Sequence, residues 1–259
     1  MSTQITTELI KELRDATGIS VMQCKRALEE AQGNQEKALA ILKKTSSDIA
    51  LKKADREAKD GGVCVKMLNN SVALVALHCE TDFVSRNEDF TNLLSKLTEE
   101  VLSLGVEKMK EGSKSMIDSV IQKTGENIQL GEAYKIENNV LGYYVHNAKS
   151  AVIVSLDGGN NELAKDVAMH IAAMKPEYIT ESEINEEARK TVTEIFEKEV
   201  ASVNKPEEIK KKMLEGKIGN YFKEKTLLNQ PFIKNPDETV GKLLENGKAK
   251  IKEIKRYSI

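Results

Sequence analysis

Residues 71–84 read SVALVALHCETDFV, an almost unbroken apolar run that passes into a polar stretch carrying a single aromatic side chain. A run of this length, rich in Val, Leu and Ala, is typical of a β-strand that is buried on both faces. Before it, Val63, Val65 and Met67 alternate with other residues, and Asn69-Asn70 supplies a turn. The two apolar segments therefore predict a β-hairpin.

The residues after this hairpin predict a helix, and the same order of elements then returns. Strands are expected over residues 128–136, 140–146 and 151–156, with the turn Asn138-Asn139 between the first two. The repeated order indicates an α+β core of two antiparallel sheet-plus-helix subdomains related by an internal duplication. Apolar residues at helical spacing mark the two helices: Phe90, Leu94, Leu97, Val101 and Leu104 in the first, and Leu163, Val167, Ile171 and Met174 in the second.

The N-terminal part of the chain predicts three short helices. Ser20 with Gln23 is a capping-box pattern that opens the second helix, and Gly18 and Gly33 stand where helices end. Three helices of this length resemble a ubiquitin-associated (UBA) domain, which is a binding module too small to enclose an active site. Its predicted apolar positions are Ile5, Leu9, Leu13 and Ala16, then Val21, Cys24, Leu28 and Ala31, then Ala38, Ile41 and Leu42.

Two long charged helices over residues 184–222, separated at Lys205-Pro206, predict a protruding helical hairpin. The chain closes with a short helix over 240–244 and a strand from Ala249. The expected organisation is a UBA-like module (1–44), an exposed and helical linker (45–62) that ends at Gly61-Gly62, an N-subdomain of the core (63–127), a C-subdomain (128–182), the coiled-coil hairpin (183–225) and the last helix and strand of the C-subdomain (226–259).

Composition narrows the classes of function. The 259 residues include 39 basic and 41 acidic side chains, and a net charge of −2 argues against a dedicated nucleic-acid binder. No apolar run is long enough to span a membrane, and residues 1–8 lack the pattern of a secretory leader. Three scattered cysteines without a CxxC pair fit a reducing compartment. We therefore expect a cytoplasmic protein with no membrane and no nucleic-acid partner.

The sequence offers little for covalent chemistry. Gly61-Gly62 and Gly158-Gly159 lack the spacing and the following Lys of a phosphate-binding loop, so no direct nucleotide binding is expected. His78, Cys79 and Asp82 are close in sequence, but neighbouring strand residues face opposite ways and no fourth ligand completes a zinc site. We interpret Cys79 as a buried small side chain and His170 as a partly buried or surface structural residue, and we expect neither a metal nor a cofactor.

The stretch Glu80 to Asn87 leaves a buried strand and enters a helix through a short loop. Two interpretations are open for its aromatic residue. Phe83 packs under the helix while Asp82 or Ser85 caps that helix. Alternatively, Phe83 stands exposed on a rigid loop and anchors the chain in a pocket of a partner.

The chain resembles the elongation factor Ts family along nearly its whole length. The resemblance rests on seven short motifs that occur in the same order and at similar spacing in the family, and no single motif decides it. The motifs are Lys11-Glu12-Leu13-Arg14-Asp15-Ala16-Thr17-Gly18, Met22-Gln23-Cys24-Lys25-Arg26-Ala27-Leu28-Glu29-Glu30-Ala31, Thr81-Asp82-Phe83-Val84, Leu141-Gly142-Tyr143-Tyr144-Val145-His146, Met169-His170-Ile171-Ala172-Ala173-Met174-Lys175-Pro176, Asn229-Gln230-Pro231-Phe232 and Thr239-Val240-Gly241.

The resemblance implies a guanine-nucleotide exchange factor, not an enzyme, whose partner is elongation factor Tu in its GDP-bound form. It implies that the N-terminal module docks on the GTPase domain and that Thr81-Asp82-Phe83-Val84 dislocates the partner's magnesium ion. Phe83 would enter an apolar pocket between GTPase helices, and Asp82 would disturb the groups that hold the metal. The partner-binding residues carried over from the family are Lys11, Leu13, Arg14, Thr17, Gly18, Met22, Cys24, Lys25 and His146.

Two features of the chain bear on its complex with the partner, and two rival functions stay open. The helical hairpin favours a one-to-one complex, and longer family members continue beyond Ile259 into a further helical module. One rival is a generic adaptor whose N-terminal module binds a ubiquitin-like or nascent-chain partner. The other is a thiol enzyme centred on His78, Cys79 and Asp82.

Overall fold

The computed structural model describes residues 5–259. The first three helices are α1 (Thr7–Thr17), α2 (Val21–Glu30) and α3 (Gln35–Lys53), and each begins at a side-chain cap supplied by Thr6, Ser20 or Asn34. Gly18 ends α1 in the left-handed region at φ 67°. Their apolar faces form a separate core around Leu28, which confirms the predicted three-helix module for the described residues. Residues 1–4 of that module lie outside the described part of the chain.

Helix α3 continues well beyond residue 44, into the stretch predicted to be an exposed linker. Its second half is packed, since Ser46 and Ala50 are buried. The hydroxyl of Ser46 donates to Gln122, and that of Ser47 donates to Asp118 at 2.8 Å. Polar side chains that are satisfied by another helix explain why this stretch shows few large apolar residues and yet is not free in solvent.

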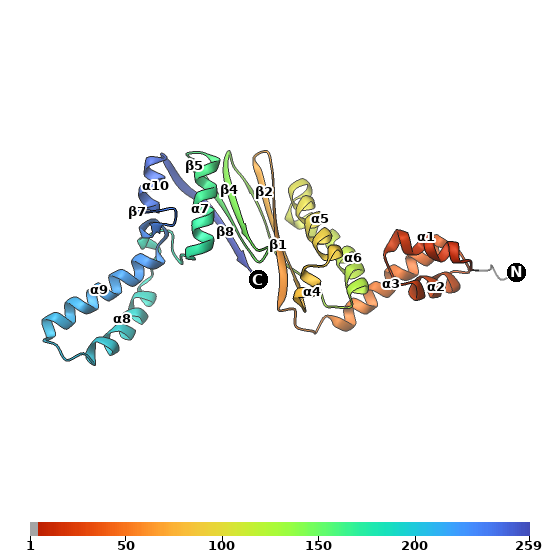
Figure 1. Cartoon of the computed structure of the whole chain (residues 1–259), viewed down its shortest axis with the longest axis horizontal. Coiled ribbons are helices and arrows are strands. Elements are labelled where there is room, and N and C mark those ends of the chain that lie inside the picture. The colour runs from red at the N-terminus through yellow and green to blue at the C-terminus, as the bar shows by residue number, and fades with distance from the viewer. Residues whose placement is uncertain (1–4) are drawn as a thin grey trace. The chain divides into compact units, whose positions relative to one another are not determined.

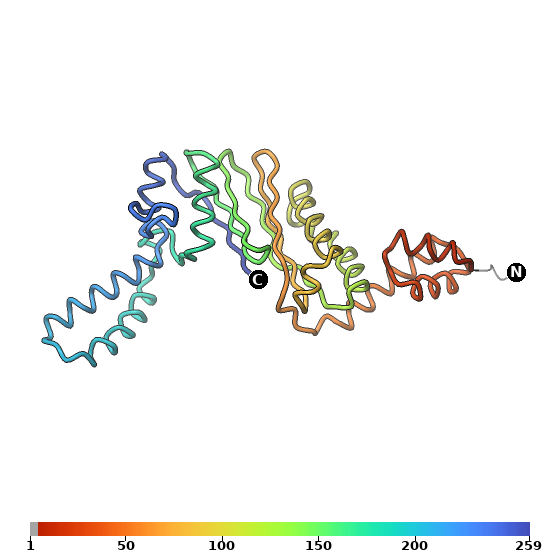
Figure 2. The backbone as a smooth tube through the Cα atoms, in the orientation of Figure 1, coloured from red at the N-terminus to blue at the C-terminus, as the bar shows by residue number. Residues whose placement is uncertain are grey.

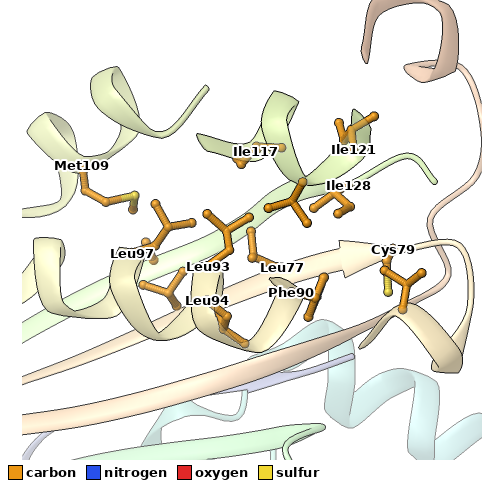
Figure 3. Close-up of a cluster of buried hydrophobic side chains, with 14 of the residues drawn as sticks. Leu77, Cys79, Phe90, Leu93, Leu94, Leu97, Met109, Ile117, Ile121 and Ile128 are labelled. Atoms are coloured by element: carbon orange, nitrogen blue, oxygen red, sulfur yellow. The ribbon is translucent and has the colours of Figure 1, made fainter. Parts of the chain in front are cut away.

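The first sheet follows α3 and has its buried strand in the middle. Strands β1 (Asp60–Leu68), β2 (Ser71–Cys79) and β3 (Gln129–Glu137) are antiparallel in the order β1-β2-β3. Helices α5 (Glu88–Leu104) and α6 (Val106–Thr124) lie against it (Figure 1). Figure 3 shows the shared core, in which Leu77 of β2 packs with Phe90 and Leu97 of α5. The predicted hairpin and following helix are confirmed, whereas α6 was not predicted.

A second sheet and its helices form the other core. Strands β4 (Val140–His146), β5 (Ser150–Gly158) and β8 (Ala249–Ser258) lie in the order β4-β5-β8, and α7 (Asn161–Met174) packs on them. Gly142 permits close packing, because a Cβ there would lie 2.1 Å from the backbone of α7. Further elements are the 3-10 turns η1 (Glu181–Glu183) and η2 (Leu227–Asn229), the short strands β6 (Pro231–Phe232) and β7 (Asn235–Thr239), and helix α10 (Val240–Asn246).

The helices α8 (Glu186–Ala201) and α9 (Glu207–Lys225) run side by side as a helical pair, as Figure 2 shows. Aromatic and aliphatic side chains hold its base together, among them Phe222, Ile184 and Val192. The pair confirms the predicted hairpin, and with the two sheets it confirms the α+β class. The domain boundaries expected from the sequence stay a prediction.

The two sheets share one topology. In each, a hairpin is followed by a helix, and a later strand pairs with the second strand of the hairpin, giving β1-β2-β3 and β4-β5-β8. The turn Asn138-Asn139, however, does not close a hairpin, since β3 and β4 belong to different sheets. The second hairpin turns at residues 147–149, where Asn147 and Ala148 take positive φ. The prediction therefore assigned the second hairpin to the wrong turn, at Asn138-Asn139 instead of residues 147–149.

By its internal contacts the chain forms two compact units. One contains residues up to Glu137 together with 145–151 and 257–259, and the other contains 138–144 and 152–256. Among the described residues, no helix has both the length and the apolar character needed to cross a lipid bilayer.

Candidate functional site

The short helix α4 (Asp82–Ser85) begins three residues after the end of β2 and places two neighbouring side chains in different surroundings. Val84 is buried in the core of the first unit, whereas Phe83 is 83% exposed. No other large apolar side chain in the described part of the chain is as exposed. Phe83 therefore does not pack under α5, and its side chain stands exposed, while its role as an anchor in a partner's pocket stays a prediction.

The chain before α4 is fixed by a carboxylate from a distant loop. Oε2 of Glu126 accepts hydrogen bonds from the backbone N–H of Glu80 at 3.1 Å and of Thr81 at 3.0 Å, and Oε1 accepts the Thr81 hydroxyl at 2.6 Å. In return, the Glu80 carboxylate accepts the backbone N–H of Asn127 at 2.7 Å. The two segments thus satisfy each other's polar groups reciprocally, which makes the entry to α4 rigid.

The end of α4 is fixed by a lysine. Lys149, in the turn between β4 and β5, donates from Nζ to the Asp60 carboxylate at 2.5 Å, to the Gly61 carbonyl at 2.6 Å and to the Ser85 hydroxyl at 3.2 Å. Burial alone would raise the pKa of Asp60, but hydrogen bonds from Lys149 and its neighbours outweigh it and hold that pKa below its usual value. Lys149 stays close to α4 because its charge is compensated there.

The acidic residue of the turn is paired within its own segment. Asp82 lies 3.2 Å from the guanidinium of Arg86, and both side chains face solvent. Neither Asp82 nor Ser85 caps α5, since that cap is Asn87, whose side chain accepts from the backbone N–H of Asp89 at 2.8 Å. The capping role expected for Asp82 or Ser85 was therefore wrong, and the Asp82 carboxylate is left at the surface beside Phe83.

The residues considered for thiol chemistry are not arranged for it. Cys79 is fully buried and its thiol faces the Thr81 carbonyl at 3.2 Å, while His78 Nε2 is bonded to the Tyr257 hydroxyl at 2.6 Å. Burial, together with nearby carboxylates, raises the pKa of Cys79 to about 12, so almost no thiolate exists near neutral pH. Among residues 5–259, no group of three His, Cys, Asp or Glu side chains is placed to hold a metal ion.

Comparison with known proteins decides the family. The sequence model described as Elongation factor TS matches residues 80–259. The elongation factor Ts of Thioalkalivibrio sulfidiphilus is 39% identical over 269 residues, which cover 98% of this chain and 92% of that protein. The chain belongs to the elongation factor Ts family. The Hahella chejuensis member is 39% identical over 266 residues, covering 98% and 92%, and the Marinobacter nauticus member 40% identical over 249 residues, covering 93% and 86%.

Elongation factor Ts is the nucleotide exchange factor for elongation factor Tu, so this chain is an exchange factor rather than an enzyme. This assignment excludes the thiol enzyme as the chain's function and agrees with the sequence prediction. It also accords with an exposed aromatic side chain on α4 close to a buried Cys79 whose thiol is protonated near neutral pH. The functional surface of an elongation factor Ts is one that contacts another protein.

The structure separates the predicted partner-binding residues of this elongation factor Ts into three groups. Leu13 and Cys24 are buried in the core of the N-terminal module, so their predicted direct contact with a partner is not available in this structure. They support the module from inside instead. Thr17 and Gly18 form the end of α1, where the Thr17 hydroxyl donates to the Leu13 carbonyl at 2.7 Å. The remaining predicted residues have exposed side chains: Lys11, Arg14, Met22, Lys25 and His146.

Sequence reasoning missed the residues that hold the turn. Glu126 and Asn127 lie between Gly125, which ends α6, and the buried Ile128. Two polar residues in such a short loop are a signal that their side chains bond to a neighbouring segment. Lys149 carries no comparable local signal, because lysine is common throughout this chain. His170, which was expected to be partly buried or at the surface, is fully buried.

Proposed function

We propose that α4 is the element that enters GDP-bound elongation factor Tu and releases its nucleotide. Phe83 inserts between helices of the GTPase, and Asp82 disturbs the groups that hold the magnesium ion and phosphates. The observation that carries this proposal is the exposure of Phe83 on a turn tied down at both ends. Exposing an aromatic ring to water is unfavourable, and a rigid exposed aromatic is typical of a binding anchor.

The mechanism is competition between two ligands of one GTPase. The exchange factor binds best to a conformation in which the magnesium and phosphate site is poorly formed, so by linkage it weakens GDP as much as GDP weakens it. Loss of magnesium removes the charge neutralisation of the phosphates. GDP then leaves, GTP enters, and the complex dissociates without any covalent step.

The N-terminal module supplies affinity in this proposal. Val21 and Met22 are large apolar side chains exposed at the start of α2, and Lys11 and Arg14 on α1 and Lys25 on α2 have exposed side chains too. Exposed apolar side chains together with polar and charged ones are typical of a protein-binding surface. We propose that it docks on the GTPase domain of elongation factor Tu in the cytoplasm, with His146 as a further contact from the core.

The test is the release of a fluorescent GDP from elongation factor Tu, with and without the full chain. We expect release to accelerate at micromolar concentrations of the factor. The adaptor alternative expects the module to bind a ubiquitin-like or nascent-chain partner and Phe83 to be dispensable. No acceleration of GDP release, or acceleration that does not depend on Phe83, would overturn the proposal.

Met22→Asp is expected to weaken docking by about tenfold while the maximal release rate stays near that of the unchanged protein. Met22 is 58% exposed, so the carboxylate disrupts an apolar contact without disturbing the fold. Titration of elongation factor Tu by the factor, followed through GDP release, separates the two quantities. Leu51→Asp on α3 is the matched control, since Leu51 is also exposed and apolar but lies outside the proposed docking surface. An equal loss in both variants would contradict the proposal.

A further inference from the structure

We propose that Glu126 is a positioning residue for nucleotide release, holding α4 so that Phe83 is presented in one orientation. This inference rests on the function proposed for α4. Glu126 lies 43 positions beyond Phe83 in the chain, on the loop between α6 and β3, and it does not belong to the tetrapeptide that is expected to touch the partner. Its carboxylate nevertheless receives three hydrogen bonds from the two residues that lead into α4.

The need for an external anchor follows from the length of α4. A helix of four residues contains almost no internal hydrogen bonds, and an isolated turn of this kind is unstable in water. Thr81 is its N-cap, but the Thr81 side chain caps no backbone N–H of the helix. The hydroxyl donates to Glu126 instead. The start of α4 is therefore held by a neighbouring loop, and the burial of Val84 holds its far side.

The three bonds also fix the direction in which Phe83 points. Two of them bind consecutive backbone N–H groups, so they restrict the backbone of Glu80 and Thr81 directly. Without this carboxylate, Phe83 would sample several orientations, and only a fraction of them would match a preformed pocket. The loss of conformational freedom on ordering this segment would then oppose the step in which Phe83 enters the partner, and this step would become slower.

Glu126 contributes to the rate and not to docking. Its side chain is half-buried, and both its oxygens are used by the segment before α4, so it does not form part of the proposed docking surface. A residue of this kind leaves the affinity of the complex nearly unchanged and lowers the rate of the step in which Phe83 enters the partner. Loss of a residue that only stabilises the fold would instead lower the amount of folded factor, which raises the apparent half-saturating concentration and leaves the maximal rate unchanged.

The first measurement compares Glu126→Ala with Glu126→Gln in the full chain. For each we would measure the maximal rate of fluorescent GDP release from elongation factor Tu and the factor concentration that gives half of it. Glu126→Ala is expected to lower the maximal rate about tenfold, with the half-saturating concentration changed less than about threefold. Glu126→Gln is expected to recover most of the rate, because an amide offers an acceptor to the backbone and a donor to the Thr81 hydroxyl. Glu107→Ala, at an exposed carboxylate on α6, is the matched control and should behave as the unchanged chain.

A second measurement places Glu126→Ala in a chain that already carries Phe83→Ala. If Glu126 acts through Phe83, it costs little further rate in that background, so the two effects are not additive. Should Glu126→Ala fail to fold, Thr81→Val removes a single hydroxyl hydrogen bond and is expected to slow release about threefold. A full maximal rate in Glu126→Ala, or an equal loss in the Phe83→Ala background, would overturn this inference. Failure of the unchanged chain to accelerate release would overturn the proposed function itself.

Discussion

Phe83→Ala is expected to lower the maximal rate of GDP release from elongation factor Tu about a hundredfold while docking weakens less than about tenfold. In the proposed mechanism the ring supplies the wedge that opens the nucleotide site, whereas the N-terminal module and the rest of the proposed docking surface continue to bind in the variant. A contact used only in the rate-limiting step changes the maximal rate, and one used equally in all bound states changes affinity. Stopped-flow release of a fluorescent GDP over a range of factor concentrations measures both.

Phe83→Ala should leave the stability of the fold almost unchanged. Since Phe83 is 83% exposed, its removal leaves no cavity, and the free energy of unfolding should change by less than about 0.5 kcal/mol. Leu104→Ala is the matched control, because Leu104 is an exposed apolar residue of the same unit at the end of α5. Equal losses of rate and affinity in Phe83→Ala would show that the ring is an anchor only, and a large fall in stability would show that it belongs to the core.

The elements next to the central strand were predictable because each has a strong local pattern. The apolar run of β2, the turn at Asn69-Asn70 and the apolar stripe of α5 lie next to one another in sequence, so no distant information is needed. Helix α6 escaped prediction for a specific reason. Its buried face contains Met109, Ser113 and Ile117, and the Ser113 hydroxyl donates a hydrogen bond to the Lys110 carbonyl at 2.9 Å. A buried serine interrupts the apolar period on which such predictions depend.

For the candidate site, the sequence alone singles out the segment but does not give its geometry. The sequence shows an aromatic residue, Phe83, after a buried strand. The local sequence does not determine whether its side chain points into the core or into solvent, because both are compatible with the same residues. The outward direction follows from the burial of Val84, from Glu126 and from Lys149, which meet at α4 from distant parts of the chain. Long-range hydrogen bonds of this kind have no periodic signature, so a single sequence does not reveal them.

His170→Ala is expected to destabilise the second unit by about 3 kcal/mol near neutral pH, because it removes two hydrogen bonds from a closed site and leaves a cavity. His170 is fully buried on α7, where Nε2 meets the Gln230 side chain at 2.8 Å and Nδ1 accepts the backbone N–H of Ile233 at 3.3 Å. An accepting Nδ1 makes Nε2–H the donor to Gln230. The histidine thus ties α7 to the segment that follows α9.

The pH dependence of this effect separates His170 from an ordinary core residue. Burial lowers the pKa of His170 below its ordinary value of 6.5, although the hydrogen bond to Gln230 opposes the shift. The unfolded chain therefore binds the proton more readily than the folded one, and the stability contributed by neutral His170 is complete above 6.5 and is lost as the pH falls through the folded-state pKa. The difference in unfolding free energy between the unchanged chain and His170→Ala should accordingly be larger at about pH 7.5 than at about pH 5.

Denaturant titration at the two pH values measures this difference, with His146→Ala as the control at an exposed histidine. The control should change stability by less than about 0.5 kcal/mol at either pH. A difference for His170→Ala that is the same at both pH values would show that another group carries the acid sensitivity. A small difference at both pH values would show that water replaces the imidazole as the hydrogen-bond partner of Gln230 and of the backbone of Ile233. The contact between α7 and the segment after α9 would then depend on Phe232 and its apolar neighbours alone.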